Sequence, residues 1–106
     1  MQKYIEYINN IKTITEKIEN NCAESIEKAA LAVSKVLKEG KKLFIFGTGH
    51  SHMLAEELFY RAGGLVQIQP ILVDELMLHI DAYASTEAER KEGLAEKIYD
   101  DYSMAE

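Results

Sequence analysis

The chain has 106 residues, which is room for one domain that buries about 65% of the surface of its unfolded form. Its net charge of −6 argues against a general nucleic-acid binder, because a protein that follows phosphate backbones needs a basic face. The single cysteine, Cys22, excludes an intramolecular disulfide and a zinc cluster and favours a reducing compartment. The longest apolar run, Leu43–Phe46, is far too short to cross a bilayer, and the amphipathic N-terminus is unlike a signal peptide. We therefore expect a soluble, cytoplasmic protein with no membrane partner.

The first region, residues 1–39, is predicted to be helical. No proline or glycine occurs between residues 3 and 39, and Asn20-Asn21 alone weakens the apolar stripe. Gly40 follows where a helix would end in a left-handed turn. We expect either two helices or one long kinked helix. The stripe consists of Ile5, Ile8, Ile11, Ile14, Ile18, Cys22, Ile26, Ala29, Ala30, Val33, Val36 and Leu37.

The second region, residues 42–102, is predicted to contain a βαβ unit. Leu43–Phe46 is apolar on both faces, as is typical of a covered parallel strand. A helix is expected over Ser51–Ala62, and a second strand over Leu65–Ile68 that Pro70 closes. This order of elements predicts two parallel strands joined by a right-handed crossover. The apolar face expected for the helix consists of Leu54, Leu58 and Ala62.

Two helical elements are expected after these strands. Asp74–Ile80 has the pattern of a short helical turn. A final helix is predicted from Thr86 to about Tyr102, because Thr86 and Glu89 fit a capping box. Ser85 and Thr86 then stand at its start, and Gly93 is a weak point within it.

The turn between the first strand and the next helix is the part of the sequence most informative about chemistry. Gly47, Thr48, Gly49, His50 and Ser51 follow the strand directly. Glycines let the backbone take positive φ and approach a ligand closely, and N–H groups at a helix start favour an anion, most often phosphate. The hydroxyl groups add further donors. The alternative is a tight turn without a ligand, in which Ser51 only caps the helix.

The histidines do not predict a metal site. His50 and His52 are two positions apart and point to different sides of a helix, so they are a poor pair of metal ligands. His50 lies in the turn and can meet a ligand, whereas His52 is expected to face solvent or a partner. His79 stands between Leu78 and Ile80 and is expected to be a partly buried structural residue. We expect no metal and no cofactor.

Several motifs together resemble the sugar isomerase (SIS) family, closest to its phosphoheptose-isomerase-like branch. They are the stretch FGTGHSHMLAEELFYRAGGL, the later PIL and LMLH segments, and the segment that runs from Ser85 to Gly93. The resemblance covers nearly the whole chain. It implies a flavodoxin-like parallel sheet in a three-layer α/β/α fold, assembly into dimers or tetramers, and a phosphorylated sugar as ligand at the C-terminal ends of the strands.

The resemblance also implies roles for individual residues. Glu57 matches the carboxylate that serves as an acid–base residue in phosphoheptose isomerases; otherwise it is a surface glutamate on an exposed helix face. Ser85 and Thr86 are expected to border the sugar site. Arg61 is expected to pair with a carboxylate or to anchor the turn at Gly63-Gly64. The phosphate-binding residues implied are Gly47, Thr48, Gly49, His50 and Ser51.

The predicted elements amount to the N-terminal half of such a domain, a partial SIS-like domain over residues 1–106. Two parallel strands leave open edges and cannot fill a three-layer core. The Ser-x-Ser-Gly loop that grips the phosphate in the family does not occur in this sequence. We expect phosphosugar binding by an isomerase-type domain; the alternatives are a non-catalytic sugar-phosphate sensor or a truncated remnant that works only as an oligomer. The apolar stripe of residues 1–39 predicts a homodimer or homotetramer.

Overall fold

The computed structural model describes residues 2–104 and divides the chain into two compact units, residues 1–39 and residues 40–106. The first unit is one helix. The second contains both strands and all the remaining helices. Each unit is described by itself.

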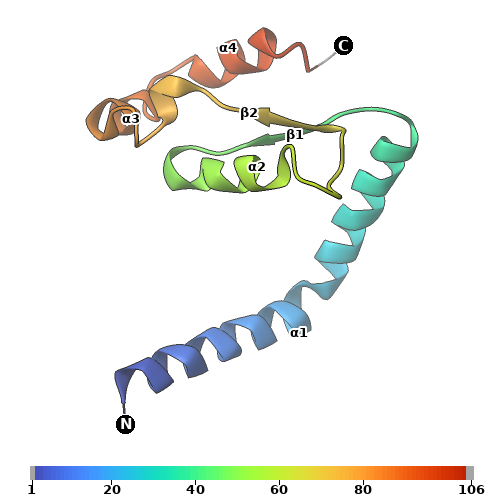
Figure 1. Cartoon of the computed structure of the whole chain (residues 1–106), viewed down its shortest axis with the longest axis vertical. Coiled ribbons are helices and arrows are strands. Elements are labelled where there is room, and N and C mark those ends of the chain that lie inside the picture. The colour runs from blue at the N-terminus through green and yellow to red at the C-terminus, as the bar shows by residue number, and fades with distance from the viewer. Residues whose placement is uncertain (1, 105–106) are drawn as a thin grey trace. The chain divides into compact units, whose positions relative to one another are not determined.

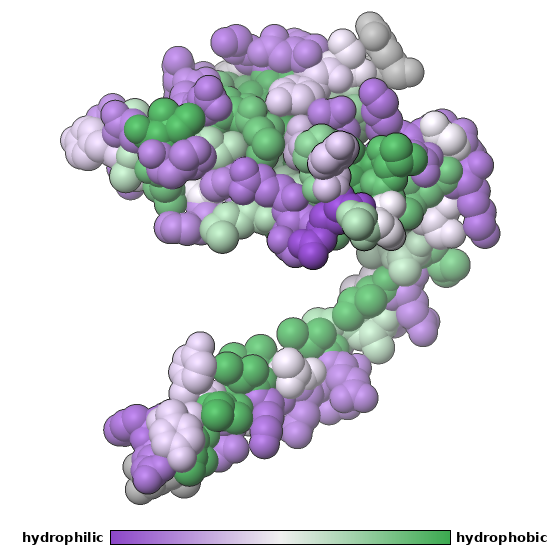
Figure 2. All heavy atoms as spheres, viewed as in Figure 1, coloured by the Kyte–Doolittle hydropathy of each residue, from purple (hydrophilic) through white to green (hydrophobic). Residues whose placement is uncertain are grey.

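The first unit consists of α1 (Lys3–Lys38), a single continuous helix that bends near its middle (Figure 1). Of the two arrangements expected for this region, the long kinked helix is therefore the one observed. None of its residues is buried. Apolar side chains gather along it (Figure 2), and we call the following residues the apolar face of α1: Ile5, Ile8, Ile11, Ile14, Ile18 and Ile26, all of which are exposed.

A two-stranded parallel sheet forms the middle of the second unit. The strands are β1 (Leu43–Phe46) and β2 (Ile68–Ile71), in a register that pairs Leu43 with Ile68 and Phe46 with Ile71. The prediction for β1 is confirmed. The second strand was expected over residues 65–68 and in fact begins at Ile68, with Pro70 inside it opposite Ile45. Proline is compatible with β2 because this strand has a neighbour on one side only among residues 2–104.

The helix in the crossover between the strands is shorter than predicted. A 3₁₀ turn, η1 (Gly49–Ser51), leads into α2 (His52–Leu58). The helix ends at Leu58 rather than at Ala62, because Phe59 is extended and Tyr60 has φ +53°. The expected apolar face is also wrong: Leu54 and Leu58 are exposed, and the buried residues of α2 are His52 and Ala55.

The helix expected from Thr86 to Tyr102 is two helices. After the short turn η2 (Asp74–Leu76) come α3 (Ala82–Ala88) and α4 (Leu94–Asp101). Asp81 caps α3 by accepting a hydrogen bond from the Ala84 N–H at 3.0 Å, so the expected Thr86–Glu89 capping box is wrong. Gly93, with φ +81°, separates the two helices at the point where the sequence indicated weakness.

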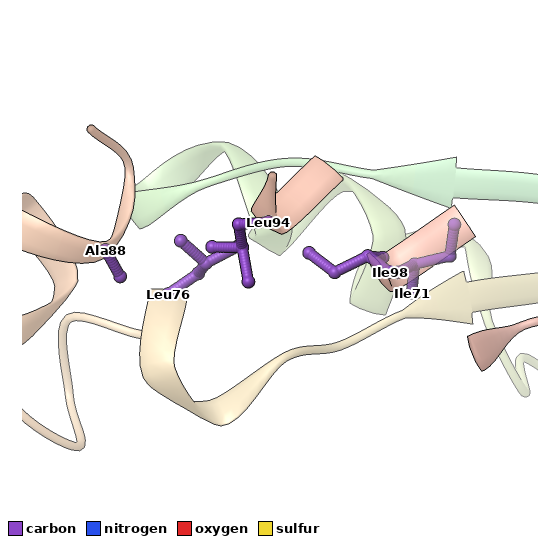
Figure 3. Packing of buried hydrophobic residues seen from close by; sticks show 5 residues of the cluster. All are labelled: Ile71, Leu76, Ala88, Leu94 and Ile98. Atoms are coloured by element: carbon purple, nitrogen blue, oxygen red, sulfur yellow. The ribbon is translucent and has the colours of Figure 1, made fainter. Parts of the chain in front are cut away.

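The hydrophobic core lies between β2, η2 and α4. Leu94 and Ile98, one turn apart on α4, lie beside Leu76 and Ile71 respectively, and Ala88 closes the end of the cluster (Figure 3). Figure 1 shows α4 on one side of the two strands and α2 on the other. The unit is thus helix, sheet, helix, with a sheet of two strands: an incomplete α/β fold of the kind predicted.

Candidate functional site

The turn after β1 depends on its two glycines in different ways. Gly49 has φ +53°, which favours glycine. Gly47 does not have a positive φ, contrary to the expectation. Glycine is needed at this position because the backbone of Ser51 and His52 lies against it. A Cβ atom on Gly47 would lie 2.6 Å from the carbonyl carbon of Ser51 and 2.8 Å from the His52 nitrogen. The chain therefore folds back on itself directly after the strand.

The accessible surface of this turn is polar. The Ser51 N–H donates to the Thr48 carbonyl oxygen at 3.0 Å, while the first residues of a helical segment leave their own N–H groups without helical partners. His50 and Ser51 are exposed and Thr48 is half-buried. Ser51 occupies the N-cap position of α2 but makes no capping hydrogen bond with its side chain. Its hydroxyl is therefore not used in the role first expected of it.

His52 is buried, which corrects the prediction that it faces solvent or a partner. Only 6% of the residue is exposed. Its Nδ1 atom hydrogen-bonds the carbonyl oxygen of Gly49, and its Nε2 atom lies 3.5 Å from Oε2 of Glu56. The ring of His79 lies 6.0 Å away between centroids, and His79 is exposed rather than partly buried as expected. Two imidazoles and a carboxylate thus lie behind the turn.

Glu89 also lies against the turn. A Cβ on Gly49 would be 3.6 Å from Oε1 of Glu89 and 3.6 Å from Cδ1 of Leu78. The fold therefore brings the end of α3 to the glycine turn. Sequence reasoning assigned Glu89 to a capping box and missed this contact, because no local pattern connects the two positions.

Ser85 and Thr86, predicted to border the sugar site, lie inside α3 and not at its start. Ser85 is completely buried, and its hydroxyl donates to the Leu76 carbonyl oxygen at 2.8 Å. Thr86 is exposed, and its hydroxyl donates to the Ala82 carbonyl oxygen at 3.2 Å. The Ser85 hydroxyl therefore stabilises the packing of α3 on η2, whereas the Thr86 hydroxyl bonds only within α3.

Glu57 lies on α2 with 67% of its side chain exposed. Its carboxylate pairs with the guanidinium of Arg61, so the expectation that Arg61 pairs with a carboxylate is confirmed. Glu56, one residue earlier, points to His52 instead. The two adjacent carboxylates of α2 thus have different partners, and the side chain of Glu57 is the more exposed of the two, at 67% against 54% for Glu56.

Between residues 2 and 104, no group of three or more His, Cys, Asp or Glu side chains is placed to hold a metal ion. Over the same residues, no helix has both the length and the apolarity that a membrane span requires.

Comparison with known proteins identifies the family. Residues 6–106 match the family model described as the SIS domain. Among similar proteins are a UPF0309 protein of Thermoanaerobacter pseudethanolicus, 47% identical over 102 residues (94% of this chain and 41% of the relative), and one of Caldanaerobacter subterraneus subsp. tengcongensis, 46% identical over 99 residues (92% and 40%). A UPF0309 protein of Geobacillus thermodenitrificans is 43% identical over 100 residues (94% and 39%). The chain spans about two fifths of the length of these relatives, and it belongs to the SIS domain family.

Proposed function

We propose that this chain binds a phosphorylated sugar at the turn Gly47–Ser51. The observation that supports this most directly is the position of the turn: it follows the C-terminal end of a parallel strand, where ligands of open α/β sheets bind. The backbone folds so tightly at Gly47 that no Cβ atom fits there, and only glycine is compatible with this turn. Membership of the SIS family supports a sugar phosphate as the anion.

In this proposal the phosphate lies against the exposed part of the turn. The backbone N–H group of the exposed His50 donates to the phosphate oxygens, and the hydroxyls of Thr48 and Ser51 and the ring of His50 add side-chain donors. Glu89 lies next to Gly49 and repels an anion, so it fits the uncharged hydroxyl groups of the sugar better. In this arrangement the phosphate group lies at the exposed residues of the turn, and the sugar hydroxyl groups lie beside Glu89.

Aldose–ketose isomerisation is the second candidate function. It moves a proton between adjacent carbons and needs a base near the substrate. The solvent-open carboxylate of Glu57 supports it as that base, in line with the resemblance to phosphoheptose isomerases. The other candidate is a sensor that binds the sugar phosphate without turnover.

We also propose that the chain associates with itself through α1. The apolar face of α1 runs along a helix with no buried residue, and an exposed apolar surface of this length is typical of an interface.

Binding is tested by thermal shift of the 106-residue chain against a panel of sugar phosphates that includes sedoheptulose 7-phosphate and glucosamine 6-phosphate. We expect at least one ligand to raise the melting temperature, with a smaller shift in Thr48→Val. The matched control is Thr13→Val, which makes the same change at an exposed threonine of α1. No shift with any sugar phosphate at millimolar concentration contradicts the proposal.

Turnover is tested separately on any sugar phosphate that binds. Incubation with the chain, followed by NMR of the sugar protons in deuterated water, detects proton exchange at the carbon next to the carbonyl. Exchange that Glu57→Gln abolishes supports the isomerase, whereas binding without exchange supports the sensor.

A further inference from the structure

The candidate site contains a buried histidine to which neither candidate function assigns a task. His52 is the first residue of α2, it is only 6% exposed, and both its backbone and its side chain contact the preceding turn. Its backbone N–H donates to the carbonyl oxygens of Gly49 and His50, and its Nδ1 atom hydrogen-bonds the same Gly49 oxygen. We propose that His52 is the positioning residue of the Gly47–Ser51 turn. The effect of His52 on ligand binding rests on the proposed function, whereas its effect on the turn does not.

The contact fixes which ring nitrogen bears the proton. A carbonyl oxygen only accepts, so Nδ1 of His52 must be the donor. The Gly49 oxygen then receives two hydrogen bonds from one residue, one from the backbone and one from the ring. This double contact fixes the orientation of the Gly49–His50 peptide, whose N–H group belongs to the surface proposed to meet the phosphate.

The other side of the ring lies near two further groups. Nε2 lies 3.5 Å from Oε2 of Glu56, one turn further along α2, and the exposed ring of His79 lies at 6.0 Å. The contact that holds the ring is therefore the one from Nδ1 to the Gly49 oxygen. A ring hydrogen-bonded there and buried beneath a glycine turn is placed to support the turn rather than to touch the ligand itself.

A pair of variants distinguishes the contribution of Nδ1 from that of Nε2. In His52→Asn the amide nitrogen can take the place of Nδ1, and in His52→Gln the longer side chain can take the place of Nε2 but not of Nδ1. We expect His52→Asn to keep the affinity for a sugar phosphate within about threefold and His52→Gln to lose about tenfold, the effect of one hydrogen bond. Equal losses in the two variants, or no loss in either, overturn the proposal.

Two measurements on the free chain do not depend on any ligand. Long-range ¹H–¹⁵N NMR at pH 8.5, with resonances assigned from single-histidine variants, should find the proton of His52 on Nδ1; a proton on Nε2 alone overturns the proposal. Amide exchange at Ser51 should be about tenfold faster in His52→Gln and unchanged in His52→Asn. If no sugar phosphate binds while both results are as expected, the proposed function fails and the positioning of the turn by His52 stands.

Discussion

The backbone of Gly49 and the carboxylate of Glu89 lie side by side, although one follows the first strand and the other ends the third helix: a side chain at Gly49 would begin 3.6 Å from Oε1 of Glu89. This contact sets a negative charge beside the turn proposed to bind phosphate. The same helix, α3, buries Ser85 against η2, so the position of Glu89 depends on how α3 packs.

Removal of this charge should strengthen anion binding. In Glu89→Gln we expect the affinity for inorganic phosphate to rise about two- to fivefold, because Glu89 is exposed and like charges about 4 Å apart in water repel by about 1 kcal/mol. Titration calorimetry measures the change. Glu87→Gln removes the same charge from another exposed position on α3 and should leave the affinity as it is. An equal gain in both variants would show only a general charge effect.

Gly47→Ala should disrupt the turn, because the new Cβ meets backbone atoms of Ser51 at 2.6 Å and 2.7 Å, which cannot move aside as a side chain does. We expect the free energy of unfolding to fall by about 2 kcal/mol and phosphosugar binding to be lost. Gly63→Ala is the control: its Cβ has open space, so only the strain of φ +76° remains, about 1 kcal/mol. Denaturant unfolding followed by circular dichroism compares the two. Equal destabilisation would contradict the close approach at Gly47.

Ser85→Ala should lower stability by about 1–2 kcal/mol, because the Leu76 carbonyl oxygen loses its buried partner. Thr86→Val, at the adjacent exposed position, should change stability by less than about 0.5 kcal/mol. Thermal unfolding measures both. If Ser85→Ala leaves stability intact but abolishes sugar-phosphate binding, Ser85 contacts the ligand and its structural role is wrong.

Glu57→Gln should hardly change stability. The ion pair with Arg61 is exposed, and such pairs contribute less than about 1 kcal/mol. Glu24→Gln breaks a matched exposed pair with Lys28 on α1 and provides the comparison. Any isomerase activity should fall at least about a hundredfold in Glu57→Gln alone, the typical effect of losing a general base. Activity that survives the substitution excludes Glu57 as the base.

Ile11→Lys should weaken self-association, because it places a charge in the middle of the apolar face of α1. Light scattering at about 50 µM protein should detect a smaller mass than for the unchanged chain. Asn9→Lys adds the same charge on an exposed polar position of α1 and should leave the mass unchanged. A stable monomer for the unchanged chain would refute the interface.

Local sequence signals predicted the elements whose boundaries depend on nearby residues. Gly40 ended the long helix region, and the apolar run Leu43–Phe46 became β1 with the predicted bounds. Gly93 marked the break between α3 and α4. The bounds of the second strand could not be predicted, because Pro70 fits inside a strand only where that strand has no neighbour on one side. The end of α2 at Leu58 could not be predicted either, because it depends on the extended Phe59 and on the positive φ of Tyr60.

By itself, the sequence determined the family and the place of the glycine turn after a parallel strand, since both depend on residue types in local order. Only the tertiary structure decided which polar groups surround that turn. A helical period identifies an apolar face but not which side of a short helix meets the sheet, so burial of His52 in place of Leu54 could not be foreseen. The contact between Gly49 and Glu89 likewise joins residues far apart in the chain, and packing of α3 and α4 on β2 and η2 is the physical reason that they meet.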